Sequence, residues 1–192
     1  MDRYRGRIVM IGTLSTGIYG IGVPPTPPNS YESIATATGT GSSGTITFNV
    51  SSLSGYKHLQ IRYISKNTAS GTDAYIQFNS GTDSVYRHQL LGNGSSASAS
   101  SNSGIAYILL TSGSSGTSMY GVGVIDILDY ASTSKAKVVR TLSGYDLNGS
   151  GLVGLGSALW TSTSAITEIS IKSAGTNFDT NTQYALYAIK DT

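Results

Sequence analysis

The sequence predicts an all-β fold: a two-sheet antiparallel β-sandwich, jelly-roll-like in its strand arrangement, preceded by an extended N-terminal arm. Three observations lead to this expectation. Short runs rich in β-branched and aromatic residues alternate with Ser/Gly/Asn breaks along most of the chain. None of these runs combines a 3.6-residue periodicity with helix caps. The connections are irregular and sometimes long, which favours a jelly roll over an up-and-down meander.

The composition agrees with a folded β protein that carries little charge. Charged residues make up 11% of the chain and hydrophobic residues 39%, and there are 24 glycines. Thirteen tyrosines and repeated Ile, Leu and Val runs are spread over the whole length, so the chain can build a core and is not a disordered Ser/Gly-rich segment. The absence of cysteine excludes disulfides, thiolate metal sites and cysteine nucleophiles.

The first 29 residues differ from the rest and are expected to form the arm. Three arginines near the start outweigh Asp2 and account for the whole net charge of +2. The remaining chain is neutral and has no basic stripe, so we expect no nucleic-acid partner. Residues 8–25 are apolar but are interrupted by Gly, Ser and Thr and followed by no A-x-A pattern. They fit neither a signal peptide nor a membrane span, and we expect no membrane partner.

A stiff spacer separates this apolar segment from the body. All four prolines lie within residues 24–28, which forces an extended chain that lacks backbone donors. An apolar segment beyond such a spacer is expected to dock on a neighbouring subunit rather than in its own core. The side chains expected to make this contact are Arg3, Arg5, Arg7, Ile8, Ile11, Ile18, Tyr19 and Ile21. Residues 30–192 are expected to form the sandwich domain.

About eleven strands are expected in the body. They cover residues 32–38, 45–50, 58–64, 74–79, 85–91, 105–111, 119–130, 137–145, 152–160, 166–172 and 184–190. The dipeptides Asn93-Gly94 and Asn148-Gly149 suit the positive φ angles of tight hairpin turns. Residues 92–104 and 112–118 are low-complexity stretches and are expected to be surface loops.

The sequence offers no catalytic constellation, and we expect no enzyme activity, metal or cofactor. There is no G-x-S-x-G elbow, and the two histidines, His58 and His88, are isolated within strand-like runs. Asp126 and Asp129 are the nearest pair of carboxylates in the strand-like runs, with Glu32 and Glu168 more remote. Three-residue spacing places the two aspartates on opposite faces of a strand, so they do not form one site.

Sugar binding is the alternative that the sequence leaves open. It uses exposed aromatic side chains next to polar loops, and Tyr145 and Trp160 are the candidates for glycan contact. Core or interface packing is the more usual role of such side chains, because Tyr and Trp combine a large apolar body with a polar end.

Several phrases of the chain, taken in order, resemble the virion structural proteins of tailed phages that infect cyanobacteria and other aquatic bacteria. These phrases are SYESIA (30–35), YKHLQIR (56–62), LGNGSS (91–96), VIDILDY (124–130), SGYD (143–146), AIT (165–167) and YALYAIK (184–190). The resemblance covers roughly residues 30–190 and leaves the arm out. It implies a non-enzymatic component of the particle, either a head decoration (cement) protein or a part of a fibre.

From this resemblance we expect a capsid decoration protein on the outer surface of the virion, at the head. It would form a homotrimer that docks on the major capsid protein and stabilises the lattice, because local three-fold positions of a head are natural docking points. The alternative is a tail or fibre module that binds a receptor or a carbohydrate.

Overall fold

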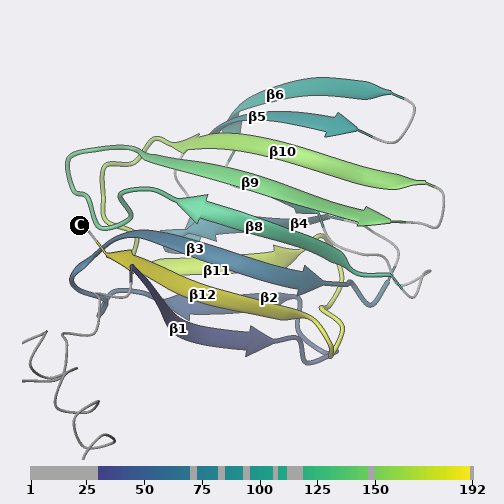
Figure 1. Cartoon of the computed structure of the whole chain (residues 1–192), viewed down its shortest axis with the longest axis horizontal. Coiled ribbons are helices and arrows are strands. Elements are labelled where there is room, and N and C mark those ends of the chain that lie inside the picture. The colour runs from purple at the N-terminus through teal and green to yellow at the C-terminus, as the bar shows by residue number, and fades with distance from the viewer. Residues whose placement is uncertain are drawn as a thin grey trace, which may run out of the picture. The chain divides into compact units, whose positions relative to one another are not determined.

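A computed structural model describes residues 30–69, 73–81, 85–92, 96–105, 108–111, 119–146 and 150–190. Twelve strands and one short 3-10 turn make up the regular structure of these residues (Figure 1). The strands are β1 (Tyr31–Thr38), β2 (Thr45–Asn49), β3 (Tyr56–Ser65), β4 (Asp73–Phe78), β5 (Val85–Gly92), β6 (Ala97–Ile105), β7 (Ile108–Thr111), β8 (Gly121–Ile127), β9 (Lys137–Asp146), β10 (Gly151–Trp160), β11 (Glu168–Ser173) and β12 (Gln183–Lys190). The turn η1 (Asn79–Gly81) follows β4.

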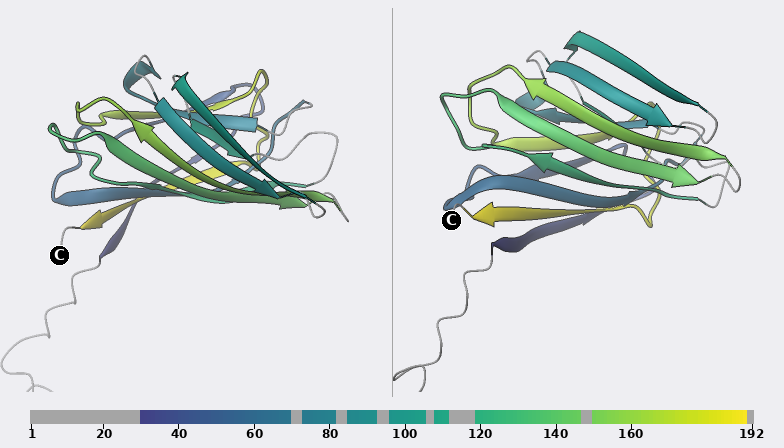
Figure 2. Two further views of the ribbon diagram at one scale, coloured as in Figure 1. Left: turned by 90° about the horizontal axis from the view of Figure 1, so that it is seen from above. Right: turned by 45° about the horizontal axis from the view of Figure 1, so that its top comes forward.

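The strands form two antiparallel sheets, which confirms the predicted all-β sandwich. The larger sheet has the order β1-β12-β3-β8-β9-β10-β5-β6, and the smaller has the order β2-β11-β4-β7. The larger sheet is the front layer in Figure 1, and the view from above in Figure 2 shows the smaller sheet stacked on one of its faces. No helix among the described residues is long and apolar enough to cross a membrane.

The jelly-roll-like arrangement becomes clear when two hairpins are set aside. Without β5–β6 and β9–β10, eight strands remain in two four-stranded sheets, β1-β12-β3-β8 and β2-β11-β4-β7. Along the chain these eight strands switch repeatedly between the sheets, as in the double Greek key of a jelly roll. The two hairpins pair with each other through β10 and β5 and extend the larger sheet by four strands beyond β8.

Strict alternation of side chains produces the core between the sheets. In β2, Ile46 and Phe48 are buried and their neighbours are exposed, because successive side chains point to opposite faces of a strand. The core also contains aromatic side chains: Trp160 packs edge-to-face on Phe78 with ring centroids 5.5 Å apart, and Tyr184 stacks on Tyr63 at 5.1 Å. The sandwich is therefore held by a single apolar layer between its sheets.

One prediction about the elements was wrong. Residues 92–104 were expected to be a loop, but residues 97–105 form β6, which pairs with β5 along its length. The Ser, Ala and Asn side chains from Ala97 to Ser103 are exposed, so these seven residues have no buried face whose pattern the sequence could reveal. The hydrogen bonds to β5 maintain their extended conformation. The two Asn-Gly dipeptides and residues 112–118 lie outside the described residues.

Candidate functional site

The most distinctive surface of the described chain is the outer face of the larger sheet, which we call the outer face throughout. Of the ten large hydrophobic side chains that are exposed in the described residues, seven lie on the two added hairpins. These are Tyr86 and Leu90 of β5, Val138 and Leu142 of β9, and Val153, Leu155 and Leu159 of β10. Their exposed fractions range from 36% for Leu159 to 63% for Val153, so they form a broad apolar surface that no described segment covers.

Strand register arranges these side chains in rows that cross the strands. Leu155 is paired with Leu90 on one side and with Leu142 on the other, and Leu142 is in turn paired with Val124 of β8. Directly paired side chains of antiparallel strands lie about 5 Å apart and contact one another. This central row is therefore a continuous aliphatic ridge across four strands.

Two further apolar rows lie on the outer face. In one, Leu159 is paired with Tyr86 and with Val138. In the other, Val122 of β8 is paired with Ile64 of β3, and both are exposed. The aliphatic surface thus spans β5, β10, β9 and β8 and reaches β3.

A polar row separates two of these apolar rows. Ser157 of β10 is paired with His88 and with Arg140, and Arg140 is paired with Asp126 of β8. The Arg140 Nη2 lies 3.8 Å from the Asp126 Oδ2, and the Gln60 Nε2 donates a 2.8 Å hydrogen bond to the Asp126 Oδ1. The aspartate is thus engaged within the face and offers little charge to a ligand.

The polar row continues through Gln60 of β3 to Tyr187 of β12, and Arg62, in the neighbouring row, contacts both of them. The Arg62 Nε donates a 2.9 Å hydrogen bond to the Gln60 Oε1, and its guanidinium lies over the Tyr187 ring at 5.3 Å from the centroid. Arginine over an aromatic face is a favourable cation–π arrangement. The charges of the outer face are therefore few and mostly paired with neighbours on the same face.

A shallow concavity of about 500 Å³ lies on the outer face between β6, β5, β10 and β9. Its lining combines an imidazole, a guanidinium and serine hydroxyls with two leucines of the central row. The lining residues are His88, Gln89, Leu90, Ala99, Ser100, Ser101, Arg140, Leu155, Gly156 and Ser157. It is an open depression in a sheet surface rather than a closed pocket.

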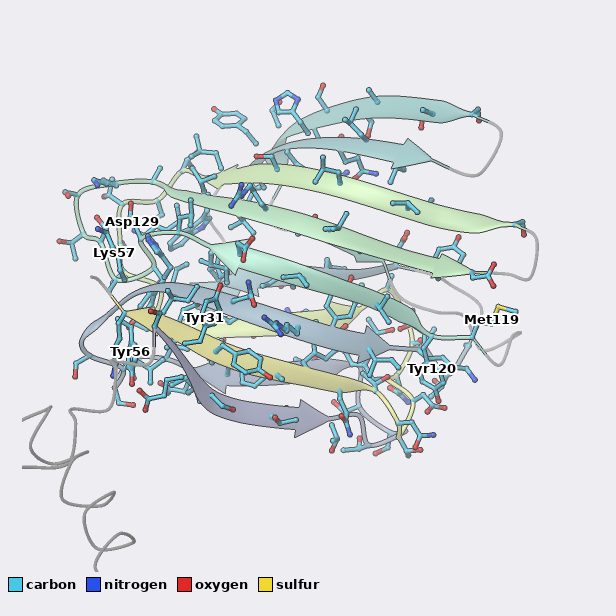
Figure 3. All side chains as sticks on the ribbon, viewed as in Figure 1. Tyr31, Tyr56, Lys57, Met119, Tyr120 and Asp129 are labelled. Carbon is cyan, nitrogen blue, oxygen red and sulfur yellow. The ribbon has the colours of Figure 1, made fainter. Side chains whose placement is uncertain are left out.

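The candidate catalytic residues are not brought together. Asp126 lies on the outer face, whereas Asp129 lies after the end of β8 in a turn with a φ angle of 53°. The backbone N–H of Asp129 donates a 3.0 Å hydrogen bond to the His58 Nδ1, and its carboxylate lies 3.6 Å from the Lys135 Nζ. Figure 3 labels Asp129 at one end of the sheet, with Tyr120 at the other end. Within the described ranges no three His, Cys, Asp or Glu side chains could hold a metal ion.

Of the two glycan candidates, one is excluded by its position. Trp160 is 1% exposed and packs in the core against Phe78, so its indole cannot contact a sugar. The alternation of β10 places Leu159 outward and Trp160 inward, which the sequence could not show because both faces of this strand are apolar. Tyr145 is half-buried and lines a small depression at the turn end of β9 and β10, beside Gly92, Asp146 and Val153. The eight predicted arm residues lie outside the described residues.

One buried cation serves the structure rather than a reaction. Lys137 is 0% exposed, and its Nζ lies within hydrogen-bond distance of four backbone carbonyl oxygens in the loops that precede β9 and follow β10. The accepting oxygens belong to Ser132 (2.6 Å), Lys135 (3.0 Å), Thr163 (2.9 Å) and Ser164 (2.5 Å). Burial lowers the pKa of this lysine, and the carboxylate of Asp129 partly opposes that change. This role could not be predicted from the residue type, because lysine is ordinarily a surface residue.

A second polar cluster stabilises the opposite end of the sheet. The Asp179 carboxylate accepts hydrogen bonds from the Asn181 backbone N–H at 2.9 Å and from the Tyr120 hydroxyl at 3.1 Å. The Lys66 Nζ lies over the Tyr120 ring at 5.4 Å. These hydrogen bonds, that of the Asn181 N–H above all, hold the pKa of Asp179 below its ordinary value. The cluster links three segments of the chain, around residues 66, 120 and 180, and stabilises their arrangement.

Comparison with known proteins gives no relative on which to rest an assignment. No family model matches the chain, no curated protein matches it, and no solved structure matches it. The functional argument therefore depends on the surface described above.

Proposed function

We propose that this protein is a non-enzymatic structural subunit of a phage particle, a decoration protein that docks on the outside of the head lattice and stabilises it. The observation that carries the proposal is the aliphatic surface of the outer face, concentrated on β5, β9 and β10. Apolar patches of more than a few hundred Å² are rare on monomeric proteins and mark interaction surfaces. This surface indicates an assembly of some kind, and the resemblance of the sequence to phage virion proteins suggests that the assembly is a phage particle.

The chemistry of the described surface supports an assembly role over catalysis. Catalytic sites bring together titratable groups with strongly altered pKa values in a cleft. On the outer face, the Asp126 carboxylate instead engages Arg140 and Gln60. The surface has large apolar area and little unpaired charge, which is the character of a protein–protein contact.

The N-terminal arm has its own part in the proposal. Its basic tip and apolar segment would bind the major capsid protein or a neighbouring subunit, and the proline-rich spacer would hold it away from the domain. In a homotrimer each subunit adds one arm, so contacts that are weak singly become strong together. This arrangement suits a protein that must cover a symmetric lattice.

Immunogold electron microscopy of intact particles, with antibody against residues 30–192, tests the proposal. Dense label over the head is the expected result. Label confined to the tail or fibres would assign the protein to host recognition instead, and particles without label would overturn the virion proposal. A full-length variant with Arg3, Arg5 and Arg7 replaced by serine should decorate heads more weakly, whereas a Lys57→Ser, Lys135→Ser, Lys172→Ser variant provides a matched loss of three positive charges on the domain.

Carbohydrate binding on a tail or fibre is the second candidate, and the concavity on the outer face is the observation that favours it. His88, Arg140 and Ser157 line one depression beside leucine side chains, a combination that can donate hydrogen bonds to sugar hydroxyls. A glycan array with the wild type and with His88→Ala and Arg140→Ala variants tests this candidate. Binding that both changes abolish would support it, and no binding by the wild type would remove it.

A further inference from the structure

We infer that the outer face over β5, β10, β9 and β8 is a self-association surface, on which a second copy of this chain packs. This inference shares its main observation, the aliphatic surface, with the proposed function, but it concerns the isolated protein in solution and is tested without the particle. It rests on the strand pattern, the exposed area and the charge of this face.

The first argument is the sequence pattern of the strands. Strands that have one face in water alternate apolar and polar residues, whereas strands covered on both faces read as nearly continuous apolar runs. β2 follows the first pattern, with exposed Thr45 and Thr47 on either side of a buried Ile46. β10 follows the second, with Leu155 and Leu159 on the outer face and Ala158 and Trp160 in the core. β10 thus has the composition of a strand that is covered on both faces.

The second argument is the size of the surface. Nine exposed side chains lie on this face from β5 to β3, namely Tyr86, Leu90, Val138, Leu142, Val153, Leu155, Leu159, Val122 and Ile64. Their exposed fractions correspond to on the order of 800 Å² of accessible surface, about the area that each partner buries in a stable interface of standard size. The surface is therefore large enough to support association without any other contact.

The third argument is charge, which decides between kinds of partner. A surface that binds an acidic or basic partner carries unpaired charge of the opposite sign. Here Arg140 and Asp126 lie side by side with opposite charges, and Arg62 is engaged with Gln60 and Tyr187. Two copies of this face would meet across a two-fold axis without strong repulsion, and the Arg140 of each copy could approach the Asp126 of the other. Such a contact pairs two subunits, so it is a different contact from the three-fold one of the proposed homotrimer. An aliphatic sheet face is also a natural partner of another such face, since face-to-face sheets pack about 10 Å apart with interdigitating side chains.

Sedimentation velocity of the full-length chain over nanomolar to micromolar concentrations tests the inference. The wild type should sediment as an oligomer, and a Leu142→Lys, Leu155→Lys variant should associate about 100-fold more weakly, because it places charges in the middle of the contact. Both leucines are more than half exposed, so the lysines can extend into solvent in the monomer. Far-UV circular dichroism and the thermal midpoint of the variant establish that it is folded. A Thr45→Lys, Thr47→Lys variant, with both changes on the outer side of the smaller sheet, is the matched control and should leave association unchanged.

Cross-linking provides a second readout that does not depend on weakening the contact. The chain has no cysteine, so Leu142→Cys introduces a single reactive thiol, and Thr45→Cys provides its control. A short bismaleimide should join two copies through position 142 and not through position 45. A wild type that remains a monomer, or an oligomer that is insensitive to the lysine variant and cross-links at position 45, would overturn the inference. Either result would leave the virion proposal to its own test.

Discussion

Replacing Lys137 by methionine tests whether one buried ammonium group holds two loops of the sandwich together. Its Nζ donates to carbonyls on both sides, those of Ser132 and Lys135 before β9 and those of Thr163 and Ser164 after β10. Methionine has a similar length and no donor. The substitution therefore removes the hydrogen bonds while it preserves most of the packing against Trp160, whose ring centroid lies 5.4 Å from the Nζ.

The magnitude follows from the groups that lose their partners. A hydrogen bond to a charged group contributes about 1.5–3 kcal/mol, and an ammonium has three donors, so the favourable contribution is roughly 4–9 kcal/mol. Burying the charge costs several kcal/mol in the other direction. We expect a net loss of about 3 kcal/mol in the free energy of unfolding, which lowers the melting temperature by roughly 6–12 °C in a domain of this size.

Urea unfolding followed by circular dichroism measures this loss, and Lys135→Met is the matched control. Lys135 lies in the same loop, but its side chain is 66% exposed and makes only an ion pair with Asp129, so its loss should change stability by less than about 1 kcal/mol. A Lys137→Met variant as stable as Lys135→Met would refute the reasoning. It would show that water or loop movement replaces the ammonium without cost.

Three further substitutions test the remaining ties of the fold. Asn79→Ala should lower the free energy of unfolding by about 2–3 kcal/mol in urea, because the Asn79 side chain donates to the Ala165 carbonyl and accepts from the backbone N–H groups of residues 167 and 168. Asn79→Gly removes the same hydrogen bonds but tolerates the φ angle of 45°, so it should regain little of the lost stability. Asp179→Asn should make stability less dependent on pH in acid, because a carboxylate with a lowered pKa stabilises the fold above its unfolded pKa and loses this contribution as the pH falls through its folded pKa. The thermal midpoints of the wild type and the variant should therefore converge in acid and diverge toward neutral pH. Gly123→Ala should lower the free energy of unfolding by about 1–3 kcal/mol in calorimetry, since the new Cβ would lie 2.6 Å from the Tyr63 ring. Gly92→Ala is the control: its Cβ would meet no atom of the described residues within 4 Å, so its effect should be nearly neutral.

The sequence was sufficient to predict the fold class, because alternation of apolar and polar residues is a local property. β2 and β3 could be located from Ile46, Phe48, Leu59 and Ile61 alone. β6 could not be located, since its Ser, Ala and Asn side chains have no buried face and only pairing with β5 makes them a strand.

The candidate site was less accessible to sequence reasoning. Trp160 and Leu159 are adjacent and both apolar, so the periodicity alone did not show which of them faces the core. The aliphatic ridge depends on register between strands that are distant in the chain, as Leu90 and Leu155 are, and register is set by tertiary pairing. The role of Lys137 was missed because its acceptors are backbone carbonyls. Every residue carries a backbone carbonyl, so the sequence does not mark which of them will surround a lysine.

The two added hairpins divide this domain into the eight strands that form the jelly roll and four strands that extend its larger sheet. Removing β5–β6 and β9–β10 leaves the eight-strand order of the jelly roll intact, so the outermost strand, β6, can change its sequence with little consequence for the core. Its residues from Ala97 to Ser103 are all exposed, and drift among small polar side chains there alters only what a partner would meet. Related chains that share the jelly roll could therefore differ in the length and composition of this extension, and so evolve new partners at little risk to folding.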